Sequence, residues 1–254
     1  MKKNILTLTL LFISMKSLAI YQGLEVKDKE YNYNQKIRVG NDKQKGSPCS
    51  AVIISRFTLM TAAHCLDNLI LSKDMFLYIQ RKKMQIEYVW IPLEYFDNIK
   101  FYFQAKEYEH KKRYHRLLAK YDIGIITLKR SLPKRFNHAK LNFEEQFSGS
   151  EVSVFGLGHT KYNKREDEFY GTPKYPMRRD HKLIKLENDT FLVTGKNNDD
   201  FITTPGDSGG GLFLKGTHEL IGITRGSSFT NYTSGSIFTP LYLLRSFILR
   251  YIKE

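Results

Sequence analysis

Short apolar runs recur along most of the chain, and most of them are bounded by Gly, Asn, Asp or Lys. Such runs, rich in Val, Ile, Leu and Phe, are typical of β-strands between turns. Many short strands separated by turn residues indicate an all-β fold, built as a sandwich or as barrels. Residues 162–180 are rich in charge, Tyr, Gly and Pro and are expected to form a long exposed loop. The pattern predicts strands over residues 36–39, 51–54, 75–79, 123–128, 152–155, 191–194 and 220–223.

The C-terminal segment follows a different period. Its apolar residues recur every three or four positions, which puts their side chains on one face of a helix. Proline is favoured at the first helical position. We therefore expect an amphipathic C-terminal α-helix that begins near Pro240. Its apolar residues are Leu241, Leu244, Phe247, Ile248, Tyr251 and Ile252.

The first nineteen residues have the pattern of a secretory signal peptide. Lys2 and Lys3 make a basic start, residues 5–15 carry no charge, and residues 17–19 form a small-x-small cleavage pattern. Eleven helical residues span about 16 Å, which is too short for a bilayer core of about 30 Å. We expect cleavage after residue 19, a mature chain that begins at Ile20, and a secreted or periplasmic location. No later run is long and apolar enough to predict a transmembrane anchor.

Composition narrows the function classes. The chain has 254 residues, of which 41% are hydrophobic, enough for one large or two modest domains with a buried core. The formal net charge is +14, but the basic residues lie in short scattered clusters without a nucleic-acid motif. We expect no specific nucleic-acid binding and only a weak attraction to anionic surfaces. Two cysteines cannot form a four-thiolate zinc site, and no metal is expected.

Three segments contain the parts of a nucleophilic acyl-transfer site. A serine hydroxyl becomes nucleophilic when an imidazole takes its proton, and a buried carboxylate fixes the imidazole tautomer and stabilises the imidazolium. Glycines beside the serine allow a tight turn, in which backbone N–H groups of Gly206 and Ser208 can converge on the oxyanion that forms. The three segments are Thr61-Ala62-Ala63-His64-Cys65, Tyr121-Asp122-Ile123 and Gly206-Asp207-Ser208-Gly209-Gly210.

In this order, the three segments resemble the histidine, aspartate and serine motifs of chymotrypsin/trypsin-like serine endopeptidases, of the bacterial secreted type. The resemblance implies two antiparallel six-stranded β-barrels, over residues 20–140 and 141–254, with the active site between them and the helix at the end. It also implies His64 as general base, Asp122 as its orienting carboxylate and Ser208 as nucleophile. A protein or peptide substrate, no cofactor and a monomeric state are expected.

The cysteine pair fits the same family. Cys49 precedes Cys65 by sixteen residues, as in the disulfide that closes the family's histidine loop. Two free buried thiols are the alternative. Export favours the disulfide, which would contribute roughly 3 kcal/mol by restricting the unfolded chain.

Activation follows from the charge of Asp207, which is adjacent to the nucleophile and would be a buried anion in need of a cation. In the family this carboxylate pairs with an amino terminus freed by proteolysis. The segment Ile20-Tyr21-Gln22-Gly23 resembles the start of such a terminus. Signal cleavage itself is therefore expected to activate the enzyme. A rival start at Ile37 lies too close to Cys49 to leave room for the strand and loop that the family has there.

The specificity pocket departs from the trypsin pattern. The family's acidic pocket floor for Lys and Arg substrates lies six residues before the serine, where this chain has Ile202. Cleavage after Lys or Arg is therefore disfavoured, and an acidic or apolar preference remains. Thr203 resembles the carboxylate-binding threonine of bacterial glutamyl endopeptidases. Arg225 either offers a cation to a glutamate side chain or points to solvent. Further pocket residues are Thr224 and Ser236.

A second function class stays open, namely a catalytically silent homologue that acts as a cationic binding module. The complete set of His64, Asp122 and Ser208 argues against it, and the unusual pocket argues for it. The chain also carries glycosylation sequons at Asn188 and Asn231, whose use the sequence does not decide.

Overall fold

The computed structural model describes most of the chain after residue 22. The expected signal peptide over residues 1–19 and the sequons at Asn188 and Asn231 lie outside the described residues. None of the described helices is both long and apolar enough to cross a membrane. The described residues are 20, 23–27, 29–40, 48–69, 75–80, 82–104, 106–107, 117–163, 166, 168–186, 189–194, 202–229 and 234–254.

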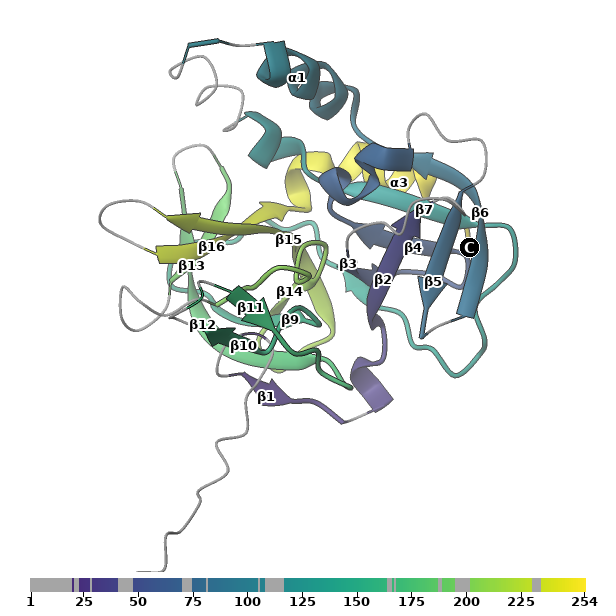
Figure 1. The fold of residues 1–254 in the computed structure, drawn as a ribbon, viewed down its shortest axis with the longest axis horizontal. Coiled ribbons are helices and arrows are strands. Elements are labelled where there is room, and N and C mark those ends of the chain that lie inside the picture. Colours follow the sequence, from purple (N-terminus) through teal and green to yellow (C-terminus); the bar gives the residue numbers. More distant parts are fainter. Residues whose placement is uncertain are drawn as a thin grey trace, which may run out of the picture.

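Six antiparallel strands close the first barrel in the order β2-β3-β4-β7-β6-β5 (Figure 1). In β2, Ile37 and Val39 are buried in the core while Arg38 between them is exposed, so one face of the strand lines the inside of the barrel and the other faces outward. Helix α1 (Leu93–Gln104) lies between β6 and β7 in the chain. The strands are β2 (Asn34–Gly40), β3 (Pro48–Ile53), β4 (Thr58–Thr61), β5 (Phe76–Ile79), β6 (Lys82–Trp90) and β7 (Gly124–Leu128).

The second barrel has the strand order β12-β13-β16-β15-β14-β9, and β12 also pairs with β9, which closes the sheet. Two short strands add to it: β1 (Leu24–Glu25) pairs with β12, and β8 (Lys140–Leu141) pairs with β15. The barrel strands are β9 (Glu151–Gly156), β12 (Met177–Lys185), β13 (Phe191–Thr194), β14 (Gly211–Leu214), β15 (Glu219–Phe229) and β16 (Ser234–Pro240).

These two closed six-stranded barrels confirm the expected fold class, and all seven predicted strands are present. The expectation of a long loop over residues 162–180 is wrong. That segment contributes to the hairpin of β10 (Lys161–Asn163) and β11 (Glu168–Tyr170), followed by the start of β12. The strands there escaped prediction because their exposed faces are polar and interrupt any apolar run.

The two barrels share one apolar core. Phe213 of β14 lies 5.3 Å from Tyr33, next to β2, and 5.3 Å from Phe155 of β9, measured between ring centroids. A second apolar cluster lies in the second barrel and includes Ile20 and Ile202. The division of the chain near residue 140 into two domains stays a prediction.

The C-terminal helix packs on the first barrel, although it follows the second in the chain (Figure 1). It consists of a 3₁₀ turn (Tyr242–Leu244) and α3 (Arg245–Tyr251). The helix therefore starts later than expected, because Pro240 is still the last residue of β16. Ile248 is fully buried, and Tyr251 stacks on Trp90 of β6 at 4.2 Å.

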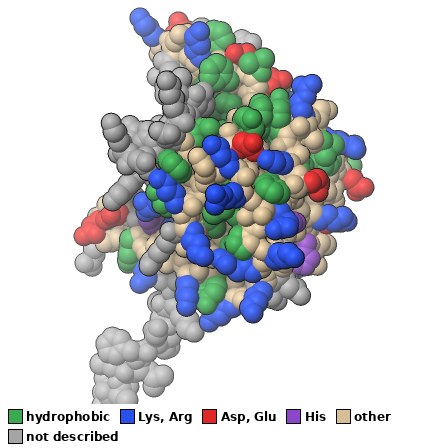
Figure 2. Space-filling view, turned by 90° about the vertical axis from the view of Figure 1, so that its right-hand side faces the viewer, with side chains coloured by type: hydrophobic (Ala, Val, Ile, Leu, Met, Phe, Trp, Pro, Cys, Tyr) green, Lys and Arg blue, Asp and Glu red, His purple; other side chains and the backbone are tan. Residues whose placement is uncertain are grey.

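The surface reflects the basic composition. Figure 2 shows Lys and Arg side chains spread over the visible face of the molecule, with few acidic side chains between them. The positive charge is therefore distributed over this face.

Replacement of Ile248 by Ala tests whether the terminal helix stabilises the fold. Ile248 is 0% exposed, so Ile248→Ala is expected to lower the free energy of unfolding by about 2–5 kcal/mol. The neighbouring Leu249 is 52% exposed, and Leu249→Ala should change it by less than about 0.5 kcal/mol. Thermal denaturation of both variants measures the difference. Equal effects would show that the helix does not depend on its buried face.

Candidate active site

Two paired strands bring His64 and Asp122 together. In the ladder between β4 and β7, Thr61 lies opposite Gly124. His64 follows Thr61 by three residues, on the 3₁₀ helix Ala63–Leu69, and Asp122 precedes Gly124 by two. The register of this strand pair thus places both side chains at the same end of the first barrel.

His64 and Asp122 are joined by two hydrogen bonds. The backbone N–H of His64 donates to Asp122 Oδ1 at 3.0 Å, and His64 Nδ1 lies 2.7 Å from Asp122 Oδ2. Burial opposes protonation of His64, but the charge and hydrogen bond of Asp122 outweigh it and raise the pKa of His64. Burial also opposes ionisation of Asp122, yet His64 and Arg225 lower the pKa of its carboxyl group. The carboxylate thus holds the proton on Nδ1 and leaves Nε2 free to act as a base.

Arg225 completes the surroundings of this carboxylate. A bulge between Thr224 and Gly226 interrupts the ladder of β15 and β16 at this residue. Arg225 Nε lies 3.6 Å from Asp122 Oδ2, and the side chain is only 15% exposed. The guanidinium thus neither points to open solvent nor stands as an isolated cation, because it faces Asp122.

A second carboxylate lies beside His64. Asp67 follows it by one turn of the same 3₁₀ helix, and Tyr95 of α1 donates to the Asp67 oxygens at 3.4 and 3.5 Å. Burial, and then the charge of Asp122, raise the pKa of Asp67 to about 6. Sequence reasoning missed both residues. The three-residue spacing from His64 signals Asp67, since i and i+3 lie on one side of a 3₁₀ helix; no local signal marks Tyr95.

The turn before Ser208 depends on its proline and glycine. Asp207 N–H donates to Thr204 O at 3.0 Å, which closes a four-residue turn with Pro205 and Gly206 in its centre. Gly206 has φ +98°, a conformation that favours glycine. Proline at the second position and glycine at the third are the preferences of a type II turn. The sequence Thr-Pro-Gly-Asp thus specifies the shape of the loop.

Ser50 of β3 ties this loop to the first barrel. Its hydroxyl donates to Gly206 O at 2.9 Å, and its N–H donates to Ser208 O at 2.7 Å. Gly209 has φ +85°, and a Cβ there would lie 2.1 Å from Ser50 O, so only glycine fits. Among the described residues, the N–H groups of Gly206 and Ser208 have no hydrogen-bond partner. Both are therefore available to a bound anionic oxygen.

The Ser208 hydroxyl donates to Arg225 O at 3.1 Å. Within the described part of the chain, no hydrogen bond joins it to His64. The two segments are nevertheless neighbours, because Cys65 Sγ lies 3.8 Å from Ser208 O. The structure thus brings His64 and Asp122 into direct contact and places Ser208 beside their segment.

The expected disulfide between Cys49 and Cys65 is confirmed, with its Cα atoms 6.3 Å apart. It links β3 to the helix that carries His64. The two sulfurs and a His64 ring nitrogen lie within 4.8 Å of one another. Because the sulfurs are bonded to each other, they are not the thiolates that a zinc site needs.

Asp207 is completely buried. Its carboxylate accepts hydrogen bonds from Gly158 N at 2.6 Å, Thr204 N at 2.8 Å and Thr204 Oγ1 at 3.1 Å. Burial outweighs these bonds and raises the pKa of Asp207 to about 6. Ile20 is fully buried in the core of the second barrel, and none of these three bonds comes from it.

The residues expected in the specificity pocket separate into two groups. Ile202 is 1% exposed and belongs to the same core as Ile20. Thr203, Ser227 and Ser236 form a hydroxyl cluster: Thr203 Oγ1 lies 2.6 Å from Ser236 Oγ and 3.3 Å from Ser227 Oγ. Sequence reasoning missed Ser227, which is revealed only by its pairing with Ser236 across β15 and β16.

Thr224, the remaining residue expected in the pocket, is completely buried. Its hydroxyl has no hydrogen-bond partner within the described residues.

Comparison with solved structures shows a shared fold. The chain is similar to neuropsin, a serine protease expressed in the limbic system of mouse brain, with a TM-score of 0.63, 16% identity and coverage of 92% of this chain and 100% of that one. It is also similar to an inactivated protease paralogue of the scabies mite, S-I1, with a TM-score of 0.58, 16% identity and coverage of 89% and 97%. For HBP the TM-score is 0.60, with 14% identity and coverage of 91% and 96%.

The sequence comparisons give the family. No curated protein sequence matches the chain. A family model described as Trypsin matches residues 20–248, which is most of the chain. The chain therefore belongs to the trypsin family.

Proposed function

We propose that the protein is an exported serine endopeptidase that cleaves peptide bonds through an acyl-enzyme on Ser208. The observation that carries this proposal is the 2.7 Å contact between His64 Nδ1 and the buried Asp122 carboxylate, next to the Ser208 loop. The disulfide between Cys49 and Cys65 supports export, since disulfides persist in oxidising compartments. Export would remove residues 1–19 as a signal peptide.

In the proposed reaction, His64 Nε2 takes the proton of the Ser208 hydroxyl while Oγ attacks the carbonyl carbon of the peptide bond. The hydroxyl must first leave Arg225 O, its acceptor at 3.1 Å. The N–H groups of Gly206 and Ser208 then donate to the oxyanion. His64 gives its proton to the amine nitrogen as the C–N bond breaks. A water molecule, deprotonated by His64, then attacks the acyl carbon. The bond from this carbon to Ser208 Oγ breaks, His64 returns the proton to Oγ, and the acid is released.

The P1 preference is proposed to exclude Lys and Arg. Ile202, at the position of the family's acidic pocket floor, is apolar and lies in the core. The Ser227 hydroxyl donates to Thr203 O at 2.9 Å, and one further proton joins the Thr203 and Ser236 hydroxyls. The cluster thus has at most one hydroxyl proton left to donate, which supports an acidic side chain. An apolar preference is the alternative.

A silent binding module is the second candidate function. One observation favours it: the Ser208 hydroxyl is bonded to Arg225 O instead of His64. Reactivity of the serine separates the two candidates, because only an activated serine reacts quickly with a fluorophosphonate.

Ser208→Ala is expected to abolish fluorophosphonate labelling and to reduce peptide hydrolysis by about 10⁴-fold or more, because the nucleophile is lost. A fluorogenic library varied at P1, with a chain that begins at Ile20, measures the hydrolysis and the side-chain preference. Ser131→Ala, a change at a serine bonded to Arg56, serves as the matched control and should keep full activity. Absence of labelling in the unmutated chain would favour the silent module, and strong cleavage after Lys or Arg would contradict the proposed pocket.

The amino terminus of Ile20 is proposed to activate the enzyme by pairing with Asp207. A chain that begins at Ile20 should be at least about 10²-fold more active than one that keeps Ala19 with an acetylated terminus. Without the amino terminus beside it, Asp207 has a pKa of about 6 in the folded state, against 3.8 in the unfolded state. The folded state therefore binds more protons between these two pH values, and stability is lost as the pH rises through this window. The Tm advantage of the Ile20 form should therefore be larger at pH 7 than at pH 4. Equal activity of both forms would contradict this pairing.

Arg225 is proposed to hold the Asp122–His64 pair in its working protonation state. Its charge opposes protonation of His64, while Asp122 and Asp67 favour it. Arg225→Gln should therefore raise the pKa of His64 and move the acidic limb of the kcat/KM profile to higher pH. Arg225→Lys keeps the charge and should leave the limb near its original position. An unchanged profile in Arg225→Gln would show that the guanidinium does not act on His64.

A further inference from the structure

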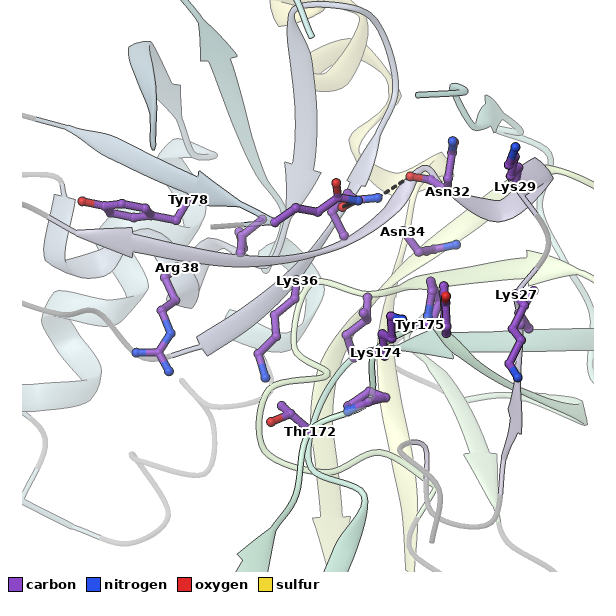
Figure 3. A pocket seen from close by; sticks show the side chains of 17 residues that line it. Lys27, Lys29, Asn32, Asn34, Lys36, Arg38, Tyr78, Thr172, Lys174 and Tyr175 are labelled. Carbon is purple, nitrogen blue, oxygen red and sulfur yellow. Dashed lines mark hydrogen bonds between the residues drawn. The ribbon is translucent and has the colours of Figure 1, made fainter. Parts of the chain in front are cut away.

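A cavity of ≈ 1030 Å³ is lined from both barrels (Figure 3). The first barrel contributes residues of β2 and β5, and the second-barrel half of the chain contributes Leu157 and residues 172–176. Ligand pockets have volumes of about 300–1,000 Å³, so the cavity can hold a sizeable ligand. None of the residues assigned to catalysis lines it.

The lining of the cavity is cationic. It contains five Lys or Arg residues and no Asp or Glu. Among the described residues, Lys27 has an acidic partner, Glu25 at 3.5 Å, which lies outside the lining; the other four have none within 4 Å. This charge is therefore largely uncompensated and favours an anionic ligand. The five cations are Lys27, Lys29, Lys36, Arg38 and Lys174.

Strand β2 presents the central part of the site. Asn34, Lys36 and Arg38 alternate with buried residues, so they share one face of the strand. Figure 3 shows Lys36 and Arg38 extending from β2 on the side of Thr172. Burial, and then the charge of Arg38, lower the pKa of Lys36, while Asp207 raises it. A bound anion would relieve the repulsion between the two cations.

Asn34 provides a second and independent indication of a ligand. It lines the cavity and is 1% exposed, yet neither Nδ2 nor Oδ1 has a hydrogen-bond partner among the described residues. Figure 3 shows the side chain on the cavity side of β2, near Tyr175. Buried polar groups without partners are unfavourable and rare. A ligand that offers both a donor and an acceptor would satisfy this carboxamide.

The chemistry of the ligand follows from these groups. A peptide group has one N–H and one C=O and matches a carboxamide, whereas ionised phosphate or sulfate groups have only acceptors. Carboxylates fit the cations, and Tyr78, Pro173 and Tyr175 offer apolar contacts to the remaining chain. We propose that this cavity binds an acidic segment of a polypeptide; the choice of a polypeptide rests on the proposed peptidase function.

The site adjoins the catalytic loop. Leu157 lines the cavity, and the N–H of the next residue, Gly158, donates to Asp207 Oδ1 at 2.6 Å. An acidic segment bound here is held close to the loop that carries Ser208. The cavity therefore recruits polypeptides with acidic segments to the enzyme.

Binding is measured with the Ser208→Ala variant, so that no peptide is cleaved. A fluorescein-labelled peptide of Glu, Asp and Tyr should bind, and more weakly at higher salt, whereas the matched Gln, Asn and Tyr peptide should not. Lys36→Gln combined with Arg38→Gln should weaken binding at least tenfold. Lys129→Gln combined with Arg130→Gln removes the same charge from an exposed turn outside the cavity and should change binding less than twofold.

Asn34→Leu separates recognition from folding. It should weaken peptide binding at least fivefold and raise the Tm, because it removes a buried polar group without partners. A lowered Tm with unchanged binding would show a structural role and overturn the assignment of Asn34.

Equal binding of the neutral peptide, or no effect of the changes at Lys36 and Arg38, would overturn the site. Binding of a sulfated oligosaccharide in place of the acidic peptide would overturn the choice of a polypeptide. Because the variant needs no catalysis, failure here leaves the fluorophosphonate test of Ser208 unaffected. Failure of that test would likewise leave a measured binding site standing.

Discussion

The buried carboxylate of Asp122 is the group on which the site depends. A charge without access to water is strongly unfavourable unless hydrogen bonds and cations compensate it. Here the backbone N–H and the ring of His64 hydrogen-bond the two oxygens, and Arg225 Nε lies 3.6 Å from Oδ2. Compensation thus comes from the first barrel through His64 and from the second through Arg225. Both barrels must be in place for the carboxylate to be tolerated.

Asp207 shows the opposite balance. It is equally buried, and its three hydrogen bonds do not prevent a rise of its pKa to about 6. Both carboxylates are desolvated, but among the described residues only Asp122 has a cation and an imidazole within 4 Å, whereas Lys36 acts on Asp207 more weakly and does not offset its burial. The difference explains why a new charged amino terminus at Ile20 would stabilise the ionised form of Asp207 but is not needed for Asp122.

The sequence was sufficient to predict the parts of the fold and site that depend on local pattern. Apolar strands such as β13 and the turn around Gly206 have such patterns. The pairing of Cys49 with Cys65 was expected instead from the resemblance to the family and from export. Strand β12 and helix α1 were missed because polar and apolar residues mix on their faces. The position of Arg225 depends on a bulge in β15, and the hydroxyl cluster of Thr203 and Ser236 depends on tertiary contacts. No local pattern encodes these two features.

The central claim is that Asp122, through His64, makes Ser208 reactive. The most direct measurement is the rate of Ser208 acylation by an activated ester across pH, followed by intact mass spectrometry, in the Ile20 form and in its Asp122→Asn variant. The account predicts that acylation rises as His64 loses its proton, and that the variant loses several orders of magnitude. Equal acylation rates in both proteins would contradict it.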